Sequence, residues 1–264
     1  MFCHPSPTSP WRPVALHVAD GNRITAAVRA GRGPALVLIP GTWGNAHTRG
    51  PLLERLDTAL TIVCVALAGQ DDNWPPPQHP SIPMFSDHIL ALADHLGLNH
   101  FFVAGNSLGG MVALEMLRFG PSRIEGAISI EGWTHWAVLQ NAFANDTTST
   151  LTESQRRRLE EVRHQLLDRW DPALRARYNA IWQEWDGWEI LRTTPLPVLE
   201  IWGDRSRPHP SREVMRIPDR PNIELAWIPN TSHNLLVEAP DRLAELMNPF
   251  VHRHAGASNP AARP

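Results

Sequence analysis

Short runs of hydrophobic residues recur along the chain and alternate with amphipathic stretches. The runs are continuous, and continuous apolar runs are typical of strands that are covered on both faces. The stretches between them repeat apolar residues at helical spacing. We therefore predict buried strands at 35–39, 61–67, 101–105, 127–130, 198–202 and 223–228, and helices at about 47–60, 84–97, 108–118 and 240–252.

The N-terminal part adds a hairpin to this pattern. The segments VALHVAD and RITAAVR are joined at Gly21 and Asn22, a pair that favours a tight turn. Alternation of strands with helices is typical of a mostly parallel sheet with helices on both faces. The chain therefore predicts the α/β class, with a sheet of eight strands.

One long stretch, 133–194, lacks any strand signal. TESQRRRLEEVRHQLLDRW predicts a helix, with Thr152 as its cap. Asp171 and Pro172 predict the start of a second helix that runs to about Leu191. We therefore expect a helical cap inserted between two strands of the sheet.

This pattern divides the chain into a core, a cap and two tails. The two ends are rich in Pro, Ser and Ala, which indicates mobile tails. The predicted parts are an N-terminal tail at 1–12, a core at 13–132 and 195–254, the cap at 133–194, and a C-terminal tail at 255–264.

Composition places the chain among ordinary globular proteins. Of 264 residues, 42% are hydrophobic and 19% charged, which argues against wholesale disorder. The net charge of −3 offers no basic surface for nucleic acid or an anionic membrane. All 24 basic residues other than histidine are arginines, so lysine chemistry is excluded. No apolar run reaches the ~18–20 residues of a membrane span, and the opening MFCHPSPTSP does not resemble a signal peptide.

The two cysteines and the histidines suggest neither a disulfide nor a metal site. Cys3 lies in the N-terminal tail and Cys64 in an apolar run, so we expect a reduced, cytoplasmic protein. Neither CxxC nor HExxH occurs in the chain. We therefore expect no metal and no organic cofactor, and a small-molecule substrate as the partner. The sequence indicates no oligomeric state.

The stretch FFVAGNSLGGMVALEML carries the candidate chemistry. An apolar strand runs into Gly105-Asn106-Ser107-Leu108-Gly109 and then into a helix. This is the G-x-S-x-G nucleophile elbow in its strand–turn–helix context. Such a tight turn strains the serine backbone and requires neighbours without side chains. We therefore predict that Ser107 is presented above the sheet, at the positive end of a helix.

With this motif, the sequence resembles the α/β-hydrolase fold superfamily over about residues 14–254. GRGPALVLIPGTWG looks like the family's oxyanion loop, and SHNLLVEAPDRL looks like its late histidine loop. The resemblance implies that Ser107 is the nucleophile and His233 the general base. It also implies that the backbone N–H groups of Thr42 and Leu108 stabilise the oxyanion. Pro40 stands where the family usually has histidine.

The acid of the expected triad has two candidates. The family's commonest position, after the strand VLEIWG, holds Ser206, and Asp204 lies two residues too early. A minority of the superfamily places the acid at the end of the strand that follows the nucleophile helix. Glu131 occupies that position here. We favour Glu131 over Asp204 as the acid. The alternative role of Asp204 is to form a turn, and the alternative role of Glu131 is a salt bridge at the cap hinge.

Tryptophans are concentrated in the predicted cap. Trp182, Trp185 and Trp188 are spaced to share one face of a single helix, which favours a role in the core. The same rings would also suit a flat, apolar substrate pocket beneath the cap. The candidate substrate-binding residues are Trp43, Trp133, Trp136, Trp182 and Trp185.

These features predict a serine hydrolase that cleaves a carboxylic ester, a class that includes lactones and thioesters. The acyl group would be carried on Ser107. The alternatives are a cofactor-independent ring-cleaving dioxygenase that uses a His–acid dyad, and a carbon–carbon bond hydrolase. Leu108 argues against the dioxygenase, because those enzymes tend to carry histidine at that position. A non-catalytic ligand receptor is a further alternative.

Overall fold

A computed structural model describes residues 9–42, 46–139, 146–167 and 169–256. All the predicted strands form, and they join in one eight-stranded sheet. This confirms the α/β class. The strands are β1 (Trp11–His17), β2 (Arg23–Arg29), β3 (Ala35–Ile39), β4 (Thr61–Ala66), β5 (Phe101–Asn106), β6 (Ile124–Ile130), β7 (Val198–Gly203) and β8 (Ile223–Ile228).

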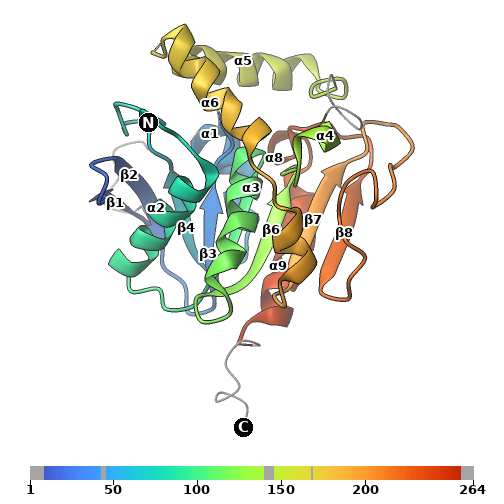
Figure 1. Cartoon of the computed structure of the whole chain (residues 1–264), viewed down its shortest axis with the longest axis horizontal. Helices are drawn as coiled ribbons and strands as arrows, with labels where there is room; N and C mark the ends of the chain where they lie inside the picture. The colour runs from blue at the N-terminus through green and yellow to red at the C-terminus, as the bar shows by residue number, and fades with distance from the viewer. Residues whose placement is uncertain (1–8, 43–45, 140–145, 168, 257–264) are drawn as a thin grey trace.

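The order of the strands brings distant parts of the chain to one edge. The order across the sheet is β1-β2-β4-β3-β5-β6-β7-β8. β1 pairs with β2, and β2 with β4, in antiparallel fashion, while all other pairs are parallel. The carboxyl ends of the parallel strands therefore point the same way (Figure 1). The turns that follow β5, β6 and β7 are neighbours as a result.

Helices cover both faces of the sheet. β5 shows why its apolar run is continuous: Phe101 and Val103 enter one hydrophobic cluster, and Phe102 and Ala104 enter the other. Each fully buried phenylalanine contributes about 2–3 kcal/mol. One face carries α2 (Ile82–His95), α3 (Leu108–Glu115), which continues as a 3₁₀ turn (Met116–Phe119), and α7 (Trp188–Thr193); the other carries α1 (Ala46–Leu53), α8 (Leu235–Glu238) and α9 (Pro240–His254) (Figure 1).

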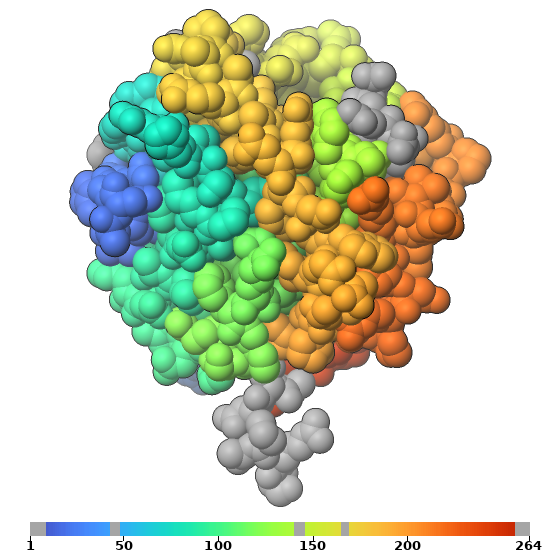
Figure 2. Space-filling view, in the orientation of Figure 1, coloured from blue at the N-terminus to red at the C-terminus, as the bar shows by residue number. Residues whose placement is uncertain are grey.

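The stretch between β6 and β7 is helical, and its two predicted caps are confirmed. The Thr152 hydroxyl accepts from the N–H of Gln155 at 3.3 Å. Asp171 accepts from the N–H groups of Ala173 at 2.7 Å and Leu174 at 3.2 Å. Helices α5 and α6 lie beyond the carboxyl ends of the strands, along one rim of the molecule (Figures 1 and 2). The helices here are α4 (Trp136–Val138), α5 (Glu153–Leu167), α6 (Pro172–Glu184) and α7.

The prediction of one helix from Asp171 to Leu191, with three tryptophans on one face, is wrong. Helix α6 ends at Glu184, and Trp185 is extended, with φ −87° and ψ 135°. The Trp185 indole donates to Glu115 on α3 at 2.6 Å, which draws the chain towards the sheet. The N–H of Gly187 then donates to a backbone carbonyl at 2.8 Å, and α7 begins as a separate helix.

The N-terminal boundary is also corrected. Strand β1 begins at Trp11, inside the predicted tail, and ends at His17. The hairpin loop, residues 18–22, is longer than expected, and within it the Asp20 carboxylate accepts from the N–H of Asn22 at 2.9 Å. Residues 1–8 and 257–264 of the predicted tails lie outside the described residues. Within the described ranges, the helices lack the length and apolar composition that crossing a bilayer requires.

Candidate active site

Ser107 occupies a strained turn between β5 and α3. Its backbone has φ 54° and ψ −122°, a region that residues with side chains rarely adopt. A Cβ atom on Gly105 would collide with the backbone carbonyl of Gly109. The two glycines therefore permit the turn, as the motif predicts. Helix α3 starts directly after the serine, so the N–H groups at the start of that helix lie beside Ser107.

The predicted oxyanion loop lies against this turn. A Cβ atom on Gly41 would be 3.3 Å from the Cβ of Ser107. The N–H of Gly41 donates to the Asn106 side chain at 3.2 Å. The buried Gln70 amide donates to the carbonyls of Gly41 at 2.8 Å and Thr42 at 3.0 Å. These bonds fix the backbone on both sides of the predicted donor, Thr42. Trp43 lies outside the described residues.

Glu131 lies beside Ser107 at the end of the neighbouring strand. The N–H of Ser107 donates to the carbonyl of Ile130 at 2.8 Å. The N–H of Glu131 donates in turn to Ile201 of β7 at 2.9 Å. Glu131 has φ 54°, so the chain turns sharply as β6 ends. Register between parallel strands therefore puts these two residues on adjacent turns.

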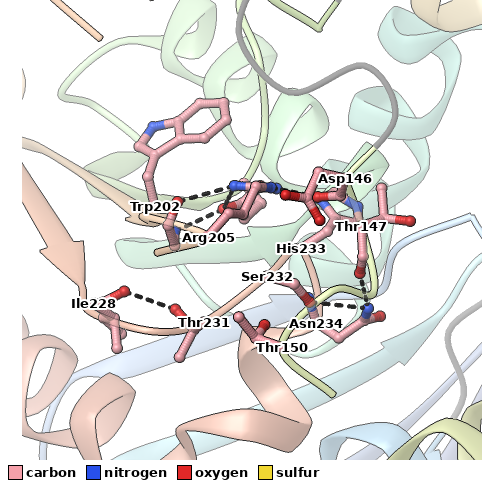
Figure 3. Close-up of polar contacts among 12 residues, drawn as sticks. Asp146, Thr147, Thr150, Trp202, Arg205, Ile228, Thr231, Ser232, His233 and Asn234 are labelled. Atoms are coloured by element: carbon pink, nitrogen blue, oxygen red, sulfur yellow. Dashed lines mark hydrogen bonds and ion pairs between the residues drawn. The ribbon is translucent and has the colours of Figure 1, made fainter. Parts of the chain in front are cut away.

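His233 reaches Glu131 from the loop between β8 and α8. Its Nδ1 lies 3.1 Å from Oε2 of Glu131. A carboxylate only accepts, so Nδ1 carries the proton and Nε2 is left as the basic nitrogen. The loop is fixed by Glu238, whose Oε2 accepts from the N–H and the hydroxyl of Ser232, both at 2.8 Å (Figure 3 shows the loop).

The Glu131 carboxylate is buried and fully hydrogen-bonded. Oε1 accepts from the N–H of Gly203 at 2.7 Å and from Nη1 of Arg205 at 3.0 Å. Oε2 accepts from Nη2 of Arg205 at 2.5 Å as well as from His233. Burial alone would raise the pKa of Glu131, but the hydrogen bond from His233 and the charge and hydrogen bonds of Arg205 outweigh it and lower that pKa below its ordinary value. Glu131 is therefore a carboxylate at neutral pH.

Asp204 has a different role in the structure. One of its oxygens accepts from the N–H groups of Ser206 at 2.9 Å and Asn230 at 2.6 Å. Its closest approach to a histidine is 3.9 Å, to His209. These contacts make Asp204 the turn-forming residue that the sequence offered as its alternative role.

The candidate tryptophans divide into two groups. Trp133 is buried, and its ring centroid lies 5.8 Å from that of His233 and 6.1 Å from that of Trp182. Trp136 is half-buried at the start of α4. Trp185, in contrast, belongs to the core, with its indole N–H bound to α3. We therefore leave Trp185 out of the candidate substrate pocket.

Sequence reasoning missed several residues that fix this site. Arg205 directly follows Asp204, one of the two candidates for the acid. Arginine is rarely buried, however, and nothing in the sequence marks this one as pointing inward. Gln70 and Glu238 carry no motif either, and only their contacts show that they hold the predicted oxyanion loop and the loop that carries His233.

The fold and this site define the class of the protein. A mostly parallel eight-stranded sheet carries a serine on a strained strand–helix turn, with a carboxylate and its histidine at the neighbouring strand end. The sequence model of the Alpha/beta hydrolase family matches residues 36–246. The chain therefore belongs to the alpha/beta hydrolase family.

Individual relatives are more distant. The acetyltransferase component of the acetoin cleaving system of Pseudomonas putida (dihydrolipoyllysine-residue acetyltransferase) is 24% identical over 84% of this chain and 64% of its own length. Epoxide hydrolase EphH of Mycobacterium tuberculosis is 40% identical over 23% of this chain and 28% of its own length. The chain thus spans less than two thirds of both curated relatives. A thermophilic esterase from Thermogutta terrifontis has a TM-score of 0.72 at 19% identity, over 92% of this chain and 99% of the esterase. That likeness shows the shared fold.

Proposed function

We propose that the protein is a serine hydrolase that cleaves a carboxylic ester, lactones and thioesters included. Ser107 is the nucleophile, His233 the general base and Glu131 the acid that orients it. The backbone N–H groups of Thr42 and Leu108 form the oxyanion hole. Substrate enters beneath the helical cap, beside Trp133, Trp136 and Trp182.

The first half of the reaction transfers the acyl group to the enzyme. Ser107 Oγ attacks the ester carbonyl carbon while its proton passes to Nε2 of His233. The carbonyl oxygen becomes an oxyanion that accepts from the two backbone donors, each worth about 3–4 kcal/mol of barrier. His233 then gives the proton to the departing oxygen, the alcohol leaves and an acyl-enzyme remains.

The second half releases the acid. A water molecule gives a proton to His233 and attacks the acyl carbon. The tetrahedral intermediate collapses, and the proton returns from His233 to Ser107 Oγ as the carboxylic acid leaves. Glu131 stays ionised throughout and stabilises the imidazolium that forms in both halves.

One observation carries this proposal: the Glu131 carboxylate, at the strand end beside Ser107, accepts from Nδ1 of His233 at 3.1 Å. This contact sets the tautomer that leaves Nε2 free to take a proton. The strained backbone of Ser107 supports the same assignment, because strain of this kind is concentrated at functional sites. The mechanism further requires that Ser107 Oγ contacts His233 Nε2, and this contact stays a prediction.

A fluorophosphonate probe tests the nucleophile. We expect stoichiometric labelling of the protein, complete loss of labelling in Ser107→Ala, and hydrolysis of short p-nitrophenyl esters that disappears in the same variant. Ser122→Ala is the matched control, because Ser122 is exposed and its hydroxyl donates to the carbonyl of Phe119 at 3.4 Å, at the opposite end of β6 from the candidate site. Folded protein that takes up no probe would refute the assignment of Ser107.

A cofactor-independent ring-cleaving dioxygenase is the second candidate function. The observation that favours it is the His233–Glu131 dyad beside the ring of Trp133, since such a dyad would deprotonate the substrate without a serine nucleophile. Oxygen uptake with a 3-hydroxy-4-quinolone tests it. Oxygen consumption that persists in Ser107→Ala, together with absent ester hydrolysis, would replace the first proposal by this one.

The setting of the proposed reaction is the cytoplasm, as the cysteine content of the sequence suggests. Cys64 is a free, buried thiol in β4. A buried thiol of this kind matches a reducing compartment. Localisation of a tagged full-length chain by fractionation would test this part of the proposal.

A further inference from the structure

Arg205 is buried against the carboxylate that holds His233. It follows β7 in a left-handed turn, with φ 52°. The side chains of Arg205 and Glu131 are each only 1% exposed. Two nitrogens of the guanidinium contact the two carboxylate oxygens, at 3.0 Å and 2.5 Å. This forked pairing is the strongest geometry available to an arginine and a carboxylate.

The guanidinium is itself fixed by the backbone around it. Its Nε donates to the carbonyl of Asp146 at 2.5 Å, and Nη1 also donates to the carbonyl of Gly203 at 2.9 Å (Figure 3 shows Arg205 beside Asp146). The N–H of Gly203 completes the cage by donating to Glu131 at 2.7 Å. Rotation of the carboxylate would break several of these bonds at once, so its orientation towards His233 is fixed.

Arg205 and His233 share one oxygen of the carboxylate. Oε2 of Glu131 accepts from Nη2 of Arg205 at 2.5 Å and from Nδ1 of His233 at 3.1 Å. The negative charge of Glu131 is therefore already balanced by Arg205, so it stabilises a protonated His233 less than an unpaired carboxylate would. The two nitrogens lie within about 6 Å of each other, a distance at which two positive charges in a protein repel strongly.

The other charged groups near His233 have partners of their own. The Asp146 carboxylate pairs with Arg207. Glu238 of α8 accepts from Ser232 and Thr150. Asp204 accepts from two backbone N–H groups of its turn. Arg205 is therefore the charged group that most directly alters the field of Glu131 at the imidazole.

We infer that Arg205 is a positioning residue that fixes the Glu131 carboxylate and whose charge, acting through that carboxylate, opposes protonation of the His233 imidazole. The inference deepens the proposed function and rests on it for its catalytic meaning. Its effect on the titration of His233 is measurable in the protein whether or not an ester is hydrolysed.

Proton NMR of the imidazole resonances tests the electrostatic part. The pH midpoint of His233, assigned with His233→Asn, is compared in wild type, Arg205→Gln and Arg253→Gln. Removing the Arg205 charge leaves the charge of Glu131 unbalanced, so the midpoint rises by roughly one unit or more. Arg253→Gln is the matched control, because Arg253 is half-exposed and pairs with Glu224 at the C-terminal end of α9; its midpoint stays at the wild-type value. An unchanged or lower midpoint in Arg205→Gln overturns the inference.

Hydrolysis measured against pH tests the positioning part. In Arg205→Gln the acid limb of kcat/KM for a p-nitrophenyl ester moves up with the NMR midpoint. Arg205→Lys keeps the charge but not the fork, so its midpoint stays within about half a unit of wild type while kcat falls roughly tenfold or more. This variant also carries the test if Arg205→Gln does not fold. If folded Arg205→Lys has the same kcat as the wild-type protein, the positioning role is overturned. If the wild-type protein hydrolyses no ester, the proposed function is refuted, and the NMR comparison alone then tests the electrostatic effect of Arg205.

Discussion

Replacing Glu200 by glutamine tests how the buried centre of β7 responds to pH. Glu200 is fully buried, opposite Ser129 of β6. Its Oε2 accepts from the Trp202 indole at 3.3 Å, and its Oε1 has no hydrogen-bond partner among the described residues. Burial raises the pKa of Glu200 to about 8, and interactions with Ser129, Trp202 and Arg212 offset only part of that effect. The folded protein therefore holds this side chain as a neutral acid at pH 7.

The sign of the effect on stability follows from proton binding. In the unfolded chain the carboxyl has the ordinary pKa of 4.5, and in the folded protein about 8. Between these values the folded state holds a proton that the unfolded state has lost, so stability falls as the pH rises. The loss is about 1.4 kcal/mol per pH unit and totals about 5 kcal/mol above pH 8. Glutamine has nearly the same shape and does not titrate, so Glu200→Gln removes this dependence.

Urea unfolding followed by tryptophan fluorescence measures the effect. Relative to wild type, the free energy of unfolding of Glu200→Gln should increase by about 3 kcal/mol between pH 5 and pH 7.5. Glu245→Gln is the matched control, since Glu245 is half-exposed on α9 and pairs with Arg242, which stays charged over this pH range. Its difference from wild type should stay nearly constant over this range. A difference for Glu200→Gln that does not change with pH would show that the buried carboxyl is not neutral.

Two further predictions concern the acid of the site and the packing of the insertion. Glu131→Gln should lower kcat for a p-nitrophenyl ester by roughly 10⁴-fold, whereas the kcat of Asp204→Asn should stay within about tenfold of the wild-type value. Thermal melts check that both variants fold. Loss of activity in Asp204→Asn alone would reverse the assignment of the acid. Trp185→Phe deletes a buried donor to Glu115 and should cost about 1–3 kcal/mol in urea unfolding. Trp182→Phe should cost less, because the Trp182 indole N–H has no partner among the described residues, and equal losses would contradict the role given to the Trp185 hydrogen bond.

The strands were predictable because a strand that is buried on both faces needs a continuous run of apolar residues, and such a run is visible in the local sequence. Six continuous apolar runs and one hairpin gave the eight strands, and the boundaries of the central strands differ from the prediction by a few residues at most. The elbow was predictable for a similar reason. Its glycines are needed within two residues of Ser107, so the constraint lies in a single short segment.

The break between α6 and α7 shows where local patterns fail. The spacing of Trp182, Trp185 and Trp188 fits one helix, although Asp186 and Gly187 between them are residue types that often end or cap a helix. The chain leaves the helix at Trp185 because its indole reaches Glu115, 70 positions earlier in the sequence. A hydrogen bond to a buried carboxylate outweighs the small helical preference of a few residues.

By itself, the sequence determined which segments form the strands of the sheet, the position of the candidate nucleophile, and the choice of Glu131 over Asp204 as the expected acid. Only the tertiary structure decided which groups surround that acid. Arg205 lies 74 positions from Glu131 and His233 lies 102, yet all three meet where parallel strands end at one edge of the sheet. Their contacts depend on strand order and on turns with positive φ, which are set by packing of the whole chain and leave no periodic trace in the sequence.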